Sequence, residues 1–207
     1  MRMTIAGTLL LLACTADAKP AEVLVGGPCE GCDAVFVGRP GKLATHARIA
    51  PVTEPGEPFV LEGTVTTQDG TPAAGVIVYA YHTDAKGEYP PMKGAKHEHG
   101  RLRGFAVSDA KGAYAFSTIR PASYPNSRAP QHVHMHVVEP GRCHYYIDEL
   151  VFSDDPHLTA ENKKIVSKGR GGEAIATPTR DAKKVWHARR DIALGAGIDD
   201  YARCGAR

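Results

Sequence analysis

Three histidines alternate with apolar residues in one short run of the 207-residue chain, at His132, His134 and His136. Valine and methionine separate them, which suits a β-strand, and alternate side chains of a strand point to the same face. Two imidazoles spaced in this way can hold one metal ion from a single strand, and imidazole suits zinc, copper and iron alike. The run therefore predicts a metal site, in preference to a row of surface histidines, but it does not name the metal.

Two tyrosines upstream offer a donor of different chemistry. Tyr89 ends the segment 84–89, and Tyr124 ends the segment 118–124 and is followed by Pro125. A phenolate is a hard anionic oxygen donor, which suits trivalent iron better than copper(I). Taken alone, either tyrosine could instead brace a turn by hydrogen-bonding the backbone, as corner tyrosines of β-sandwiches do.

A second histidine cluster, His97-Glu98-His99, lies in a segment rich in lysine and glycine. Nothing in its spacing fixes a face of a helix or strand. We therefore expect these residues to be exposed polar side chains of a loop.

Short strands must position these residues. Runs rich in β-branched and aromatic residues end at turns such as 68–70 and 109–112, which is typical of a sandwich or barrel. We expect an all-β chain, a sandwich of mostly antiparallel strands with one short C-terminal helix. The helix is expected to start from Asp155 as N-cap with Pro156 at its first position and to run to about residue 166. The strands are expected at 61–67, 76–81, 104–108, 113–117, 132–138, 145–152 and 185–194.

The composition excludes several classes of protein. Hydrophobic residues make up 43% and charged residues 23%, which is the balance of a packed globular chain and not of a disordered one. The formal net charge of +2 gives no basic field for nucleic acid. The 22 glycines and 15 prolines indicate many turns, which argues against a helical bundle.

The first residues are typical of an export signal. A short basic start precedes the apolar segment 4–13, which is too short to span a bilayer and suits a signal peptide of residues 1–18. Ala16-Asp17-Ala18 fits ordinary signal cleavage, whereas Leu11-Leu12-Ala13-Cys14 resembles an imperfect lipobox with Cys14 as a lipid anchor. Both alternatives place the protein outside the cytoplasm, as a periplasmic, membrane-anchored or secreted protein.

Four cysteines remain beyond that segment: Cys29, Cys32, Cys143 and Cys204. In an oxidising compartment an even number indicates disulfides, and four cysteines allow three pairings that the sequence leaves open. No βαβ pattern surrounds Cys29 and Cys32, so structural disulfides are favoured over a redox pair. We expect an N-terminal arm at 19–57, the sandwich at 58–194 and a C-terminal tail at 195–207.

With these residues in place, the chain resembles the intradiol ring-cleavage dioxygenases, the family of protocatechuate and catechol dioxygenases. The hairpin and turn motifs are weakly specific because non-catalytic sandwich modules share them. The specific part is the order Tyr89, Tyr124 and then His132-x-His134. The resemblance covers about half of the chain, roughly 56–156, with a weaker one at 185–194, and rests on segments 63–73, 81–89, 102–109, 113–119, 124–125, 130–134 and 151–156.

The resemblance implies a mononuclear non-haem Fe(III) held by Tyr89, Tyr124, His132 and His134. It implies a catechol substrate that chelates the iron as a dianion, while Tyr124 leaves the metal and helps to take a substrate proton. Oxygen would then be inserted between the two hydroxyl-bearing carbons, through a cyclic anhydride, to give a muconate-type diacid. In this scheme the metal acts as a Lewis acid and as a template.

The sequence departs from the family near the first histidine. The family commonly has an arginine shortly before His-x-His, and the nearest arginine here is Arg128, to which we assign that role of stabilising negative charge on the ring. Gln131 replaces a small residue beside His132 and could act as an outer hydrogen-bond donor. A shifted register that uses His134 and His136 stays open.

Two other functions remain possible. One is a non-catalytic exported sandwich module that binds metal or a cell-surface partner through its histidine strand, and the other is a periplasmic copper or zinc protein. The identity of the catechol and the oligomeric state cannot be predicted.

Overall fold

The computed structural model describes residues 22–29, 31–92, 98–166 and 168–205. The predicted signal segment 1–18 and its alternative anchor Cys14 lie outside these residues. No helix within the described ranges has the length and apolar character needed to cross a membrane.

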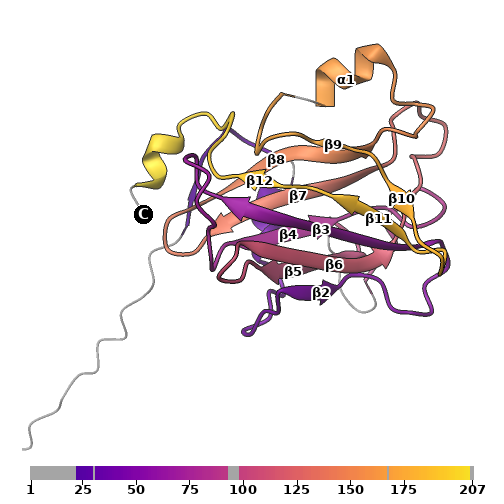
Figure 1. Cartoon of the computed structure of the whole chain (residues 1–207), viewed down its shortest axis with the longest axis horizontal. Helices are drawn as coiled ribbons and strands as arrows, with labels where there is room; N and C mark the ends of the chain where they lie inside the picture. The colour runs from indigo at the N-terminus through magenta and orange to yellow at the C-terminus, as the bar shows by residue number, and fades with distance from the viewer. Residues whose placement is uncertain (1–21, 30, 93–97, 167, 206–207) are drawn as a thin grey trace, which may run out of the picture.

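Two six-stranded sheets form the structure, as the sequence predicts for an all-β sandwich (Figure 1). The long central strands pair antiparallel, whereas the short strands β1, β2, β9, β11 and β12 each join a sheet in parallel. The first sheet has the order β1 (Val23–Leu24), β8 (Cys143–Phe152), β7 (His132–Glu139), β4 (Ile77–Tyr81), β5 (Arg103–Val107), with β9 (Ile175–Ala176) beside β8. The second has the order β10 (Thr179–Arg180), β11 (Trp186–Arg189), β3 (Pro58–Thr66), β6 (Ala113–Ile119), β2 (His46–Arg48), with β12 (Ile192–Ala193) beside β3.

Alternation along the strands builds the core between the sheets. Phe59 of β3 meets Phe152 of β8 edge to face, with ring centroids 5.5 Å apart. On β7 the apolar residues Val133, Met135 and Val137 point into this core. The intervening histidines therefore share the outer face of the first sheet.

The predicted last strand, 185–194, is wrong in its continuity. It is divided into β11 and β12 because Arg190 turns inward and is buried. Its guanidinium donates to backbone carbonyls of residues such as Gly171, and its own carbonyl accepts a hydrogen bond from Tyr114 at 2.6 Å. Asp191 meanwhile accepts from the backbone and hydroxyl of Thr64, so neither residue continues a regular strand.

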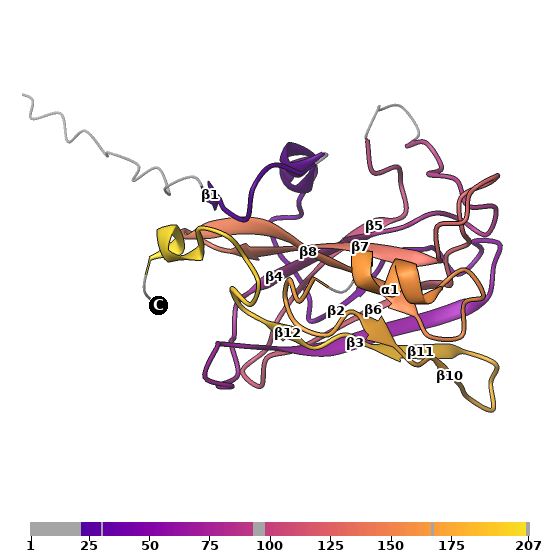
Figure 2. The ribbon, with the colours of Figure 1, turned by 90° about the horizontal axis from the view of Figure 1, so that it is seen from above.

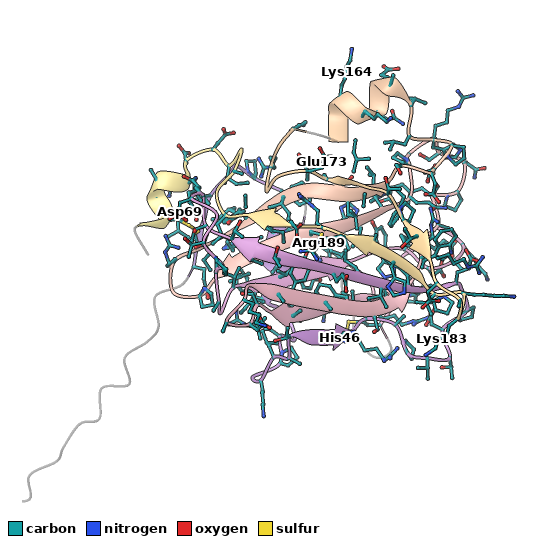
Figure 3. The ribbon with its side chains drawn as sticks, viewed as in Figure 1. His46, Asp69, Lys164, Glu173, Lys183 and Arg189 are labelled. Atoms are coloured by element: carbon teal, nitrogen blue, oxygen red, sulfur yellow. A yellow bond between two sulfur atoms is a disulfide. The ribbon has the colours of Figure 1, made fainter. Side chains whose placement is uncertain are left out.

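The helix prediction is correct in kind and wrong in its start. The helix α1 spans Ala160–Val166, and Thr159 caps it by accepting a hydrogen bond from Asn162 N at 3.2 Å. Asp155 instead closes the preceding turn, where its carboxylate accepts from His157 N at 2.7 Å. The helix lies at the edge of the sandwich, and Lys164 points away from it (Figure 3).

The N-terminal arm covers the outer face of the first sheet. Its 3₁₀ helix η1 (Cys32–Phe36) places Val35 against Tyr79, Tyr81 and Phe105, in a cluster separate from the central core. Figure 2 shows this arm, in indigo, passing along that side of the sheet. The histidine face of β7 is thus enclosed, not exposed to solvent.

The cysteines pair as Cys29–Cys32 and Cys143–Cys204. The first bond closes a tight loop in the arm, and the second attaches the C-terminal η2 (Tyr201–Cys204) to the start of β8. Disulfides of this kind persist in oxidising compartments. Export itself stays a prediction.

Two loops at one end of the sandwich are tied to each other. Residues 82–89 follow β4, and residues 120–131 connect β6 to β7. Thr83 Oγ1 donates to Ala122 O at 2.7 Å, and Ala122 N donates to Asp84 O at 3.1 Å. Tyr89 and Tyr124 lie on these loops, so the same hydrogen bonds set their relative position.

Gly87 allows the two loops to approach. Its φ is +81°, and a Cβ added there would lie 1.9 Å from the carbonyl oxygen of Ser123. Any other residue would be strained and would also push the second loop away. Gly70 has a similar φ of +85° but nothing within 4 Å of an added Cβ.

We predict that Gly87→Ala destabilises the fold far more than Gly70→Ala. The first change adds a backbone clash to the left-handed strain and should cost about 3 kcal/mol or more, and the second should cost about 1 kcal/mol. Denaturant unfolding of the two variants measures the difference. Equal losses would mean that the loops do not depend on their contact at Gly87.

We also predict unequal contributions from the two disulfides. The bond between Cys143 and Cys204 spans 61 positions and the bond between Cys29 and Cys32 spans 3. Loop-closure entropy then gives about 4 kcal/mol for the first and about 1.5 kcal/mol for the second. Paired Cys→Ala variants compared in denaturant unfolding test this order, and a larger loss from the arm pair would contradict it.

Candidate metal centre

The two histidines of the predicted pair aim the same ring nitrogen at one point. His132 Nδ1 lies 2.7 Å from the carbonyl oxygen of Pro130, and His134 Nδ1 lies 3.0 Å from a carboxylate oxygen of Glu149. Both oxygens only accept hydrogen bonds, so each Nδ1 carries the proton and each Nε2 presents a lone pair. The two Nε2 atoms are 3.1 Å apart.

Both tyrosine hydroxyls reach the same point. Tyr124 Oη lies 3.0 Å from His132 Nε2 and 3.2 Å from His134 Nε2, and Tyr89 Oη lies 2.7 Å from Tyr124 Oη. The structure therefore brings together the four side chains that the sequence predicts as ligands. They come from one strand and from the two linked loops.

This arrangement fits a metal ion. The Tyr124 proton can serve only one of the two Nε2 lone pairs, and the lone pairs repel each other when nothing positive lies between them. Ligand atoms bound at about 2 Å to one first-row ion lie about 3 Å apart, which is the spacing of these atoms. Two imidazoles and two phenolates are also a donor set that suits Fe(III).

The electrostatics of the protein alone favour the neutral forms of Tyr89 and His132. Burial raises the pKa of the Tyr89 phenol, and its hydrogen bond with Tyr124 raises it further. Burial also lowers the pKa of His132, and His134 beside it adds to the shift. A bound cation would act in the opposite direction on both phenols, because it stabilises the phenolate form.

Glu149 is a site residue that the sequence did not reveal. Burial alone would raise its pKa, but hydrogen bonding from His134 and the nearby histidines bring the pKa down to about 2. It also accepts a hydrogen bond from Tyr146. Between the partners of Val133 and Met135, strand β8 contains one extra residue, and this bulge turns Glu149 toward the site. Sequence analysis could use only the regular alternation of a strand, which the bulge interrupts.

The prediction for the cluster at 97–99 is wrong at His99. This residue is buried, and its ring stacks on Tyr81 at 3.8 Å with an interplanar angle of 4°. Tyr81 stacks in turn on His134 at 4.5 Å, and Tyr79 hydrogen-bonds His99 Nδ1 at 2.8 Å. The aromatic outer face of β4 thus provides a place for the ring. Glu98 is exposed as predicted, and His97 lies outside the described residues.

Three other residues weighed in the sequence lie apart from the four donors. Arg128 is exposed and does not line the adjoining cavity, and its proposed role stays a prediction. Gln131 accepts a hydrogen bond from Arg120 at 2.9 Å, on the side of the loop away from the cavity. His136 is fully buried and packs against Tyr146, and within the described part of the chain neither of its ring nitrogens has a hydrogen-bond partner.

A cavity of about 480 Å³ is lined by three of the four donors, Tyr89, Tyr124 and His134. The arm forms one wall of it, the loop that contains Glu98 and His99 forms another, and strands β4, β7 and β8 form the floor. Its lining consists of Pro28, Cys29, Gly31, Tyr81, Tyr89, Glu98, His99, Tyr124, His134, Tyr146 and Glu149. The volume is sufficient for a small ligand of one aromatic ring.

Curated dioxygenases are similar to this chain in sequence. The chain is 29% identical over 147 residues to catechol 1,2-dioxygenase 1 of Acinetobacter lwoffii, covering 59% of this chain and 47% of that enzyme. It is 31% identical over 143 residues to a chlorocatechol 1,2-dioxygenase of Pseudomonas sp. (strain P51), covering 57% of this chain and 55% of that one. The chain thus spans about half the length of the curated relatives that it matches.

Solved structures share the fold. The dioxygenase domain of a dioxygenase–carbohydrate-binding protein fusion from Streptomyces sp. SirexAA-E superposes with a TM-score of 0.58 at 21% identity, covering 77% of this chain and 94% of that one. Catechol 1,2-dioxygenase from Pseudomonas arvilla C-1 gives a TM-score of 0.61 at 22% identity, covering 83% and 60%. A family model described as dioxygenase matches residues 35–191, which is most of the chain. Together with the sandwich fold and the catechol dioxygenase relatives, this match shows that the chain belongs to the intradiol dioxygenase family.

Proposed function

We propose that this protein is a non-haem Fe(III)-dependent intradiol dioxygenase that cleaves a catechol-type ring with O2 to a muconate-type dicarboxylate. The observation that carries the proposal is the convergence of His132 Nε2, His134 Nε2 and the Tyr89 and Tyr124 hydroxyls within 2.7–3.2 Å contacts. When bound there, Fe(III) would supply a Lewis acid that withdraws electron density from a chelated catechol.

The protein's own residues have separable tasks in this proposal. Tyr89, His132 and His134 would hold the metal, and Glu149 keeps the His134 ring oriented through Nδ1. Tyr124 is the candidate for proton transfer, because its hydroxyl lies among the donors and also lines the cavity. In its phenolate form Tyr124 would be a base able to take a proton from the hydroxyl of a catechol bound in the cavity.

The cavity favours an enzyme over a module that only stores or displays metal. Structural metal sites are closed by their protein ligands, whereas catalytic sites keep an open position for substrate. Here Tyr89, Tyr124 and His134 each reach both the donor cluster and the cavity wall. A ligand in the cavity would therefore lie directly beside the metal.

The first test is the colour and metal content of the purified protein. Tyrosinate bound to Fe(III) absorbs visible light by charge transfer, so iron-loaded protein should be red-brown and should consume O2 with catechols. Tyr89→Phe and His132→Ala should lower iron content and bleach the colour, whereas His187→Ala, at a half-buried histidine of the second sheet, should retain both. Colourless, iron-free protein from iron-replete cells would exclude this function, and would leave a zinc, copper or non-catalytic module.

We further predict that Glu149→Gln weakens metal binding without unfolding the chain. Replacing the carboxylate by an amide removes the negative charge that increases the basicity of His134 and leaves a weaker hydrogen-bond acceptor, and such outer partners contribute about 10- to 100-fold in metal affinity. Competition with a chelator, followed in the visible band, measures the loss. Glu173→Gln, on an exposed residue away from the cavity, is the matched control. Identical chelator curves for the two variants would remove Glu149 from the metal site.

A further inference from the structure

The wall of the cavity that faces away from the strands contains an acidic side chain. Glu98 lines the cavity together with Pro28, Cys29 and Gly31 of the arm. A Cβ added to Gly31 would lie 3.1 Å from Glu98 Oε2, so the carboxylate lies directly against the arm. The disulfide between Cys29 and Cys32 holds that part of the arm in place.

The charges along the described lining all have one sign. Glu98 and Glu149 are the charged residues among the lining side chains, and no lysine or arginine is among them. Glu149 is already engaged by His134 and Tyr146. Glu98 has no ion-pair partner within the part of the chain that the structure describes. It is therefore the carboxylate that an incoming substituent would meet.

The negative charge of the cavity lining affects which substituted rings can bind. A ring bound at the four donors would lie in a cavity whose lining includes Glu98, so a substituent directed away from the donors would approach that carboxylate. A carboxylate on the ring would be repelled there, and no described basic residue of the cavity could compensate. An ammonium group would be attracted, and a neutral group would be unaffected.

We propose that Glu98 determines substrate specificity, so that the site prefers catechols with a cationic or neutral substituent and discriminates against those with a carboxylate. This inference rests on the proposed function, because it concerns the catechol bound at the same site. It differs from that function in naming a residue that takes no part in metal binding.

Three catechols of similar size, substituted at the same ring carbon, test the proposal: aminoethyl-, propyl- and carboxymethylcatechol. The iron-loaded protein and Glu98→Gln are compared by kcat/KM for each substrate in O2 uptake. Dividing the wild-type value by the variant value cancels the intrinsic reactivity of each ring. Because Glu98 is exposed, we expect a modest effect. The quotient of wild-type to Glu98→Gln kcat/KM should be about two- to fivefold above one for the cationic substrate and below one by a similar factor for the anionic substrate.

The control removes the same charge elsewhere. Glu62 is exposed on β3 of the second sheet, in register with Arg189, which Figure 3 labels on that sheet. Glu62→Gln should leave all three quotients near one, and added salt should shrink the effect of Glu98→Gln. Equal quotients for the three substrates in an active Glu98→Gln enzyme would overturn the specificity role alone. Absence of O2 uptake by wild-type, iron-loaded protein with every catechol would overturn the proposed function and this inference with it.

Discussion

Two imidazole lone pairs directed at each other form the constraint around which this molecule is organised. His132 and His134 each commit Nδ1 to a fixed oxygen acceptor, so neither ring can turn its protonated nitrogen toward the other. In water or in an ordinary core such a contact would be unfavourable, because a buried acceptor without a donor destabilises the folded state. A cation at the point that both rings address would remove this cost, since the Tyr124 hydroxyl has one proton and can donate to only one of the two nitrogens.

Several segments that are distant in sequence orient the donor side chains around this point. The extra residue in β8 turns Glu149 toward His134, and stacking of Tyr81 on the other side fixes the plane of that ring. The hydrogen bonds between the loops 82–89 and 120–131 deliver the two tyrosine hydroxyls together. None of these contacts includes the proposed metal position. Each of them nevertheless fixes the orientation of a donor side chain, which would otherwise lose conformational freedom when the metal binds.

The sequence predicted the positions of site residues where these residues recur with the regular alternation of a β-strand. Alternation along β7 assigned His132, His134 and His136 to one face, and the resemblance to the intradiol family, carried by the order of tyrosines and histidines, selected the four predicted donors. It could not assign Glu149, because an irregularity in β8 breaks the alternation that sequence analysis uses. It also mistook His99 for a surface residue, since its burial depends on Tyr79 and Tyr81, nearly twenty positions earlier in the chain. The position of the arm could not be predicted either, because its contacts are long-range and its own sequence has no period.

The arm explains how a sandwich of this size can enclose a cavity beside the predicted donors. The outer face of the first sheet forms only the floor of this cavity, so it needs a second wall. Residues around Cys29 provide it, and their disulfide closes so short a loop that its main effect is local, on the shape of this wall, and not on global stability. The wall brings Gly31 against His99 and Glu98, and a Cβ added at that glycine would lie 2.2 Å from His99 Nε2. The arm therefore encloses the cavity and also sets where the Glu98 carboxylate lies along its lining, which would link a segment distant in sequence from the four donors to the proposed choice of substrate.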